Sequence, residues 1–141
     1  MLPLDGRTVT RCLIDYSFGL VLDGEPSVEV SLSYFRFRDR DGREHLLSAE
    51  ADRRLLAPAL ACFGLTVAHA YAWRSGRLQL GFTDGTRVEA DPHHEFEAWQ
   101  VSGPGSVFVV SPAGGGEPAV WDGTPGLAVP IEDLRPPEGD E

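Results

Sequence analysis

The stretch of sequence that decides the fold is VEVSLSYFRFR, residues 28–38. Apolar and polar side chains alternate along it, which is the period of a β-strand that buries one face. From Val28 to Tyr34 the apolar residues hold the even-numbered positions, but Phe35 and Phe37 then continue the pattern at odd-numbered positions. Such a change of phase is typical of a β-bulge or of a strand that bends from one layer into another. The sequence therefore predicts a β-rich protein with one of these two features at this point.

The chain also contains an internal repeat. Residues 6–9 (GRTV) recur as residues 64–67 (GLTV), and the same offset of 58 positions relates Leu20 to Leu78 and Leu22 to Leu80. Each half then reaches an Asp-Gly turn and an alternating run, Val28-Glu-Val30 in one half and Val88-Glu-Ala90 in the other. The second half changes phase as well, after Phe96 and Ala98, at Trp99 and Val101. These matches predict a duplicated unit, spanning about residues 6–48 and 64–111.

One helix is predicted near residues 50–63. Its apolar residues recur at helical spacing, and Gly64 is suited to the position after the last turn. Pro58 would cost about 3 kcal/mol in a helix interior, so the helix either begins near Arg54 or bends at the proline. The strand expected at 65–74 places its small residues on one face, which we expect the helix to cover. The predicted apolar stripe of the helix comprises Leu55, Leu56, Ala59, Leu60 and Phe63.

The predicted architecture is mainly β (α+β), with two antiparallel meander units joined by this helix and packed as a sandwich or a strongly bent sheet. A chain of 141 residues is typical of one domain, predicted to span 1–134, and the acidic tail at 135–141 is predicted to be disordered. The first residues lack the pattern of a secretory signal, and no apolar run approaches the roughly 20 residues that cross a bilayer. We therefore expect a cytoplasmic protein in which Cys12 and Cys62 are buried, reduced thiols.

The charge of the chain constrains its partners. Asp and Glu number 22 against 12 basic residues, which gives a formal net charge of −10 and a pI near 4.7. A negative surface attracts basic proteins and repels nucleic acids and anionic membranes, so neither of the latter is an expected partner. The basic residues are all Arg, and Arg36, Arg38, Arg40 and Arg43 alternate with Phe35 and Phe37. We interpret them as the solvated side of a strand whose Phe residues point inward.

The densest polar cluster is DPHHEFE, residues 91–97. His93 and His94 with neighbouring carboxylates could bind a divalent metal or transfer protons. However, adjacent residues of a strand point to opposite faces, so both imidazoles can reach one ion only from a loop. Solvated turn residues are the simpler interpretation. No metal, cofactor or catalytic residue is therefore predicted, and the protein is not expected to be an enzyme.

The same region supplies candidate contacts for a protein partner. Asp91, Glu95 and Glu97 would present negative charge, and Trp99 and Trp121 would supply the aromatic contacts that are common at interface centres. Trp residues in such positions more often belong to the core. His69, between Val67 and Tyr71, is interpreted as a core or edge histidine with a backbone partner.

Several motifs of the second half resemble those of a family of small uncharacterised bacterial domains. They are an aromatic-Glu-x-Trp strand after a Pro turn (96–99), a glycine-rich loop (112–116) and a short apolar strand that ends in Trp (119–121). The resemblance covers about residues 6–122; Glu117-Pro118 departs from it, because the family's glycines run directly into the apolar strand. It implies no catalytic residues. Small acidic domains of this kind are similar to immunity proteins, which neutralise a toxin by blocking it.

The sequence thus favours a non-enzymatic protein-binding domain, an immunity-type inhibitor that occludes a basic toxin or effector. The alternative is a small-molecule or metal-binding domain that uses a pocket between the two sheet units, with His69, His93 and His94. A third hypothesis is a scaffold protein that associates with itself through an edge strand.

Overall fold

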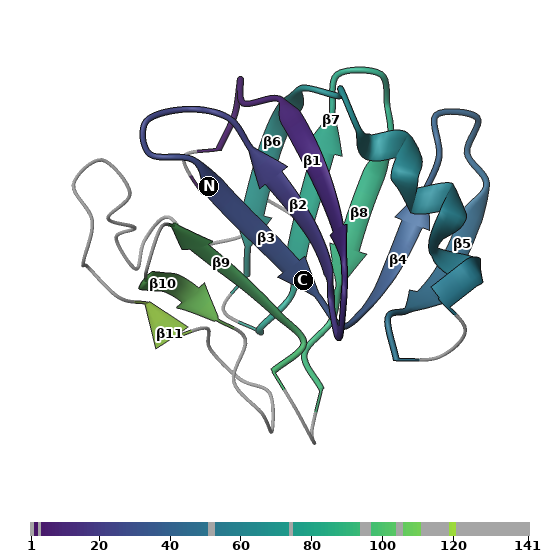
Figure 1. Cartoon of the computed structure of the whole chain (residues 1–141). Helices are drawn as coiled ribbons and strands as arrows, with labels where there is room; N and C mark the ends of the chain where they lie inside the picture. Colours follow the sequence, from purple (N-terminus) through teal and green to yellow (C-terminus); the bar gives the residue numbers. More distant parts are fainter. Residues whose placement is uncertain are drawn as a thin grey trace.

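The chain folds into two antiparallel sheets that face each other across one core (Figure 1). The computed structural model describes residues 2, 4–50, 53–73, 75–93, 97–103, 106–110 and 119–120. The first sheet has the order β1 (Val9–Ile14), β2 (Phe18–Leu22), β3 (Val28–Leu32), β9 (Trp99–Gly103), β10 (Ser106–Val110) and β11 (Ala119–Val120). The second has the order β5 (Glu44–Ser48), β4 (Tyr34–Arg38), β8 (Arg87–Ala90), β7 (Leu78–Phe82) and β6 (Val67–Ala72). The prediction of a mainly β fold is confirmed.

The change of phase at residues 28–38 is a change of layer. β3 ends at Leu32 in the first sheet, and β4 begins at Tyr34 in the second. The chain crosses back between β8 and β9, and β3 pairs with β9 while β4 pairs with β8. The two crossings, from β3 to β4 and from β8 to β9, therefore lie side by side and link the sheets. Leu32, Phe35 and Trp99 are buried beside these crossings, in the space between the sheets.

The two units have the same topology. The strands of the first sheet, β1-β2-β3-β9-β10, correspond one by one to β6-β7-β8-β4-β5 of the second. β1 and β6 are irregular at equivalent places, between Val9 and Arg11 and between Val67 and His69. Each unit thus contributes three strands to one sheet and two to the other.

The offset of 58 does not hold along the whole repeat. Leu20 pairs with Cys12 and Leu80 pairs with Ala70, so Leu20 corresponds to Leu80 rather than to the predicted Leu78. The connection between β6 and β7 is two residues longer than that between β1 and β2. A shift of two positions keeps every side chain on the same face of a strand, so the alternation of the sequence cannot detect it.

The helix is a 3₁₀ helix, η1 (Arg53–Cys62), with Pro58 inside it. A 3₁₀ helix has three residues per turn, so positions three apart share a face. Accordingly Leu56, Ala59 and Cys62 are buried, whereas Leu55, Leu60 and Phe63 are exposed. The apolar stripe was predicted with the period of an α-helix, and the prediction is wrong for these three residues, which are exposed. Gly64 follows with a positive φ of 85°, as expected for the residue that ends a helix.

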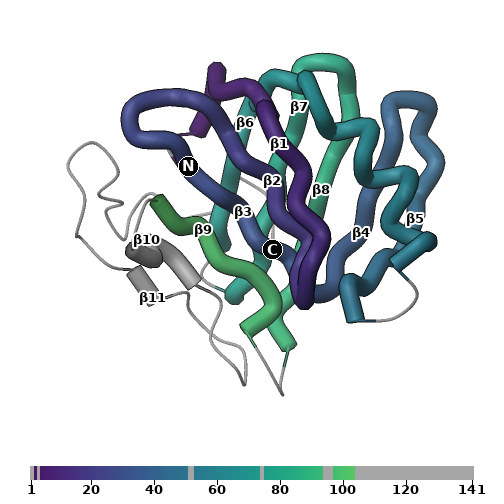
Figure 2. Tube along the Cα trace, in the orientation of Figure 1, coloured from purple at the N-terminus to yellow at the C-terminus, as the bar shows by residue number. Residues whose placement is uncertain are grey.

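η1 also packs elsewhere than predicted. It contacts the edge strands β5 and β1, and Figure 2 shows it on the same side of the molecule as β4 and β5. The alanines of β6 that were expected to meet it, Ala70 and Ala72, face the core, and Ala68 is exposed. The irregularity after Val67 shifts the inward face of β6, so His69 and Tyr71 lie on its outer side. Among the helical residues that the structure describes, none forms a segment long and apolar enough to span a membrane.

Candidate functional site

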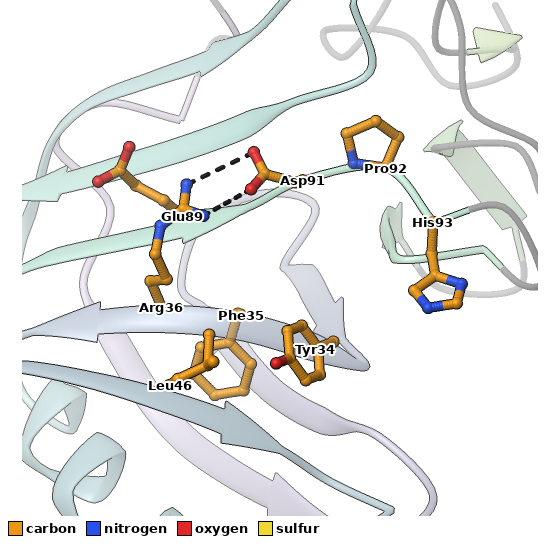
Figure 3. Close-up of a pocket in the computed structure, with 8 residues that line it drawn as sticks. All are labelled: Tyr34, Phe35, Arg36, Leu46, Glu89, Asp91, Pro92 and His93. Atoms are coloured by element: carbon orange, nitrogen blue, oxygen red, sulfur yellow. Dashed lines mark hydrogen bonds and ion pairs between the residues drawn. The ribbon is translucent and has the colours of Figure 1, made fainter.

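Part of the predicted polar cluster borders a hollow on the outer face of the second sheet, beside β4 and β8 (Figure 3). Its volume is about 150 Å³. An apolar cavity of roughly this size holds one benzene-sized group, so the hollow fits a single side chain better than a cofactor. The lining residues are Tyr34, Phe35, Arg36, Leu46, Glu89, Asp91, Pro92 and His93.

Asp91 forms an ion pair with Arg36 at this hollow. Nη1 of Arg36 lies 2.5 Å from Oδ2 of Asp91, and Nη2 lies 3.4 Å from Oδ1. The hydrogen bond to Asp91 raises the pKa of Arg36. Half of the Asp91 side chain is exposed, so the pair contributes at most about 1 kcal/mol to stability. The pair does, however, neutralise Asp91, which therefore offers no free negative charge to a partner.

Glu89, on the same face, is also paired. It accepts a hydrogen bond from Arg77, whose guanidinium lies 5.1 Å from the ring centre of Trp73. Arg36 and Glu89 are directly opposite each other in β4 and β8, so the cross-strand neighbours at this hollow have opposite charges, which stabilises the pairing of the strands. The outer face around the hollow is a balanced network rather than the acidic face that the composition suggested.

The structure separates the remaining predicted partner contacts. Trp99 is only 1% exposed, and its Nε1 donates a hydrogen bond to the carbonyl oxygen of Gly76 at 2.8 Å. It is a core residue, so its prediction as an interface anchor is corrected. Glu97 is exposed and borders a different hollow, with Ser31, Gln100 and other polar residues. Glu95, His94 and Trp121 lie outside the described residues.

His69 and His93 do not form a common site. His69 lies on β6, and β7 separates it from β8, which precedes the hollow that His93 lines. Nε2 of His69 lies 3.1 Å from Nε2 of Gln79. The ring of His69 occupies the space that a side chain at position 81 would need, and this position is a glycine. Within the described part of the chain, no group of three or more His, Cys, Asp or Glu residues could hold a metal ion.

The pattern of the sequence did not predict the apolar surface that is exposed at η1. Leu55, Leu60 and Phe63 are 59%, 42% and 63% exposed, and we call them the η1 face. Nε of Arg53 donates to the carbonyl oxygen of Asp15, which places the start of η1 beside the exposed turn between β1 and β2. The other large apolar residues exposed in the described ranges lie on this turn or on β1, β4 and β5; they are Ile14, Tyr16, Tyr34 and Leu46. A three-residue period would have predicted that all three residues of the η1 face lie outside the buried side of η1, which Leu56, Ala59 and Cys62 form.

A second hollow, of about 250 Å³, lies at the end of η1. Apolar residues form part of its wall, and the rest consists of three aspartates of two turns together with Arg40 and Thr86. Oδ1 of Asp39 accepts hydrogen bonds from the N–H groups of Arg43 and Asp41, and these bonds lower the pKa of Asp39. We call this space the acidic hollow; its lining comprises Phe37, Asp39, Arg40, Asp41, Ala61, Leu65, Asp84 and Thr86.

A family profile described as a family of unknown function, DUF6188, matches residues 1–122. The chain belongs to the DUF6188 family. No curated protein and no solved structure matches it. The match extends over both units of this DUF6188 chain and all three of the hollows described above, but it names no activity. The geometry of the surface must therefore indicate the function.

Proposed function

We propose that this DUF6188 chain is a non-enzymatic protein-binding domain that holds a basic partner on the η1 face and in the acidic hollow. The η1 face is the observation that supports this proposal. Leu55 and Leu60 are exposed on a short helix whose buried side belongs to the core, and Phe63 is exposed directly after the last residue of that helix. Exposed apolar groups that cluster in this way are typical of interaction sites.

The acidic hollow supports a basic partner. Ala61 and Leu65, which flank Phe63 along the chain, contribute to its wall, so the hollow adjoins the η1 face. A Lys or Arg side chain could place its aliphatic stem against Leu65 and its charge beside the carboxylates of Asp41 and Asp84. The net charge of −10 would also speed the approach of a basic protein.

The finer form of the proposal is an immunity-type inhibitor that acts in the cytoplasm and covers the working surface of a basic toxin or effector. The small size, the acidity and the resemblance of the second half to small acidic bacterial domains support it. The proposed surface differs from the one predicted from the sequence. Phe63 replaces the buried Trp99 as the central aromatic contact, and Asp91 is at most peripheral because it pairs with Arg36.

A photo-crosslinking experiment in the native host tests the proposal. A crosslinking amino acid replaces Phe63 in the full chain, and the control carries it at Ser27, an exposed residue of the loop between β2 and β3. We expect Phe63, but not Ser27, to capture a protein with a pI above about 8, as charge attraction requires. Capture of a second copy of the chain, of an acidic protein, or of nothing at Phe63 would overturn the proposal.

Binding to the captured protein, once it is purified, provides the quantitative test. We expect F63D to weaken binding at least about tenfold, because an exposed aromatic at an interface centre is typically worth more than 1.4 kcal/mol. We expect S27D to leave the dissociation constant unchanged and added salt to slow association. Equal affinities of F63D and S27D would show that the η1 face is not the binding surface.

A further inference from the structure

We propose that the outer face of the second sheet carries a binding site for a phosphomonoester group, formed by Arg38, Arg40 and Arg87. These residues line a hollow of about 250 Å³ between the β4–β5 turn and the β7–β8 turn, and we call it the basic hollow. The basic hollow shares Asp39 and Arg40 with the acidic hollow, whereas Arg38 and Arg87 line only the basic hollow of the two. Its remaining lining residues are Asp39, Gly42 and Gly85.

The first observation is the register of the two strands. Arg38 of β4 and Arg87 of β8 are directly opposite each other in the antiparallel ladder. Residues opposite each other on one face have Cβ atoms about 5 Å apart, and like charges in these positions destabilise the pairing. Arg40 approaches the same hollow from the turn that follows β4.

The second observation is that these three guanidinium groups have no carboxylate partner among the residues that the structure describes. On the same face, Arg36 pairs with Asp91 and Arg77 pairs with Glu89. In the described ranges no ion pair joins Arg38, Arg40 or Arg87 to any carboxylate. The chain contains 22 acidic residues for 12 basic ones, so it is not short of carboxylates that could neutralise the cluster.

The carboxylates nearest in the fold do not fill this role. Glu44 is opposite Arg38 across β4 and β5, but the two form no ion pair and Glu44 does not line the hollow. Asp39 lines it, but its Oδ1 is occupied by two backbone N–H groups and its Oδ2 lies 3.9 Å from Nε2 of His45. The basic hollow therefore retains an excess of positive charge in a strongly negative protein.

The chemistry of the lining favours a phosphate group. Each guanidinium presents parallel N–H donors that fit two oxygens of an oxyanion, and three of them match a dianion better than a single carboxylate. Gly42 and Gly85 have φ angles of 89° and 94°, and no atom lies within 4 Å of where a Cβ would stand. The turns thus leave the hollow open, with room for the group to which the phosphate is attached.

Titration of the full chain at constant ionic strength, followed by NMR, tests the site. The probes are inorganic phosphate, phosphoserine and acetate, and the variants are R38Q, R87Q and R11Q. Arg11 is an exposed residue of β1, so R11Q removes the same charge from the other sheet. We expect saturable binding of both phosphates, weakened at least about tenfold in R38Q and R87Q but unchanged in R11Q, because each lost charged hydrogen bond is worth more than 1.4 kcal/mol. Equal binding of acetate, equal losses in R11Q, or no saturation with either phosphate would overturn the proposal.

Thermal unfolding separates binding from a structural role of Arg87. Without phosphate and at low salt, we expect R87Q to unfold at the same temperature as the wild-type chain or higher, because it removes the repulsion of Arg38. Phosphate should raise the unfolding temperature of the wild-type chain and of R11Q, but not that of R87Q. A lower unfolding temperature of R87Q without phosphate would instead assign Arg87 to the stability of the sheet. Arg38 and Arg87 do not line the acidic hollow, so R38Q and R87Q leave its wall unchanged, and their effects on phosphate binding are measured separately from the binding of a basic protein.

Discussion

The side-chain hydroxyl groups of Thr8 and Thr66 lie 3.1 Å apart, and the two residues, 58 positions apart in the chain, form an antiparallel bridge with each other. The backbone hydrogen bonds around them occur in matching pairs. If the residue of the first unit is replaced by its equivalent in the second unit, 58 positions later, and the other residue by its equivalent 58 positions earlier, one bond of a pair becomes the other. The two units are therefore related in space by a pseudo-two-fold axis, and this axis passes between the two threonines. The bonds are Val9 N–H to Leu65 O and Val67 N–H to Arg7 O, both 2.8 Å, and Gly6 N–H to Val67 O and Gly64 N–H to Val9 O, at 2.8 and 2.9 Å.

The bond between the threonines can be measured with a double-mutant cycle. We expect T8V and T66V each to lower the free energy of unfolding by about 1 kcal/mol, since each leaves one half-buried hydroxyl without its partner. The double variant should lose less than the sum, because valine has the shape of threonine and no polar group is then left unpaired. Urea unfolding of the four proteins gives these values. Strictly additive losses would show that the two hydroxyl groups do not interact.

The sequence revealed the repeat but not its full register. Residues 6–9 and 64–67 lie at the axis, where both copies need a glycine with positive φ followed by a strand, and they kept a recognisable pattern. Further along, only the alternation of apolar side chains is retained. That alternation identifies the buried face of each strand, but Leu20 matches Leu78 and Leu80 equally well, so strand pairing alone distinguishes them.

The buried side of η1 could not be predicted with the period of an α-helix. Substitutions of two adjacent leucines test which side is buried. Leu56 is fully buried and Leu55 is 59% exposed. We expect L56A to lower the free energy of unfolding by about 2–5 kcal/mol, the usual cost of a cavity in a core. The matched control L55A should change it by no more than about 0.5 kcal/mol. Denaturant unfolding measures both, and similar losses in the two variants would argue for an α-helical face instead.

The candidate site was only partly predictable for a related reason. Of the cluster predicted at residues 91–97, the structure places Asp91, which is exposed, and His93, which is half-buried, at the same hollow. The partner of Asp91, Arg36, is 55 positions away and meets it only because β4 lies beside β8. Long-range pairing of this kind decides which acidic residues remain free, so the count of charges overstated the acidity of this face.

The two cysteines are expected to be unreactive in the folded protein. Burial raises the pKa of Cys62 to about 12, with smaller contributions from Cys12 and Asp84, and burial also raises the pKa of Cys12. The thiolate is the reactive form, so at pH 8 alkylation of Cys62 should require unfolding. Mass spectrometry after a pulse of iodoacetamide, with and without urea, measures this. In the variant C12S only Cys62 can be alkylated. Alkylation of Cys62 in the folded variant at the rate of a free thiol would contradict its buried position.

His69 should make the stability depend on pH. Burial lowers the pKa of His69 below its ordinary value of 6.5, and the positive charge of Arg87 lowers it further. The unfolded chain therefore binds a proton more readily than the folded one in the range between the two pKa values. The contribution of His69 is complete above about pH 6.5, and stability is lost as the pH falls below this value toward the folded pKa.

The variant H69Q isolates this effect from the other histidines. Glutamine cannot titrate but can still bond to Gln79, so H69Q should lose less stability than the wild-type chain between pH 7.5 and pH 5.5, by urea unfolding. NMR titration of the imidazole in R87Q supplies the second test. Removing the neighbouring cation should raise the pKa of His69 toward 6.5, because less work is then needed to place a positive charge on the ring. An unchanged pKa in R87Q, or the same pH dependence of stability in H69Q and the wild-type chain, would contradict this account of the outer face.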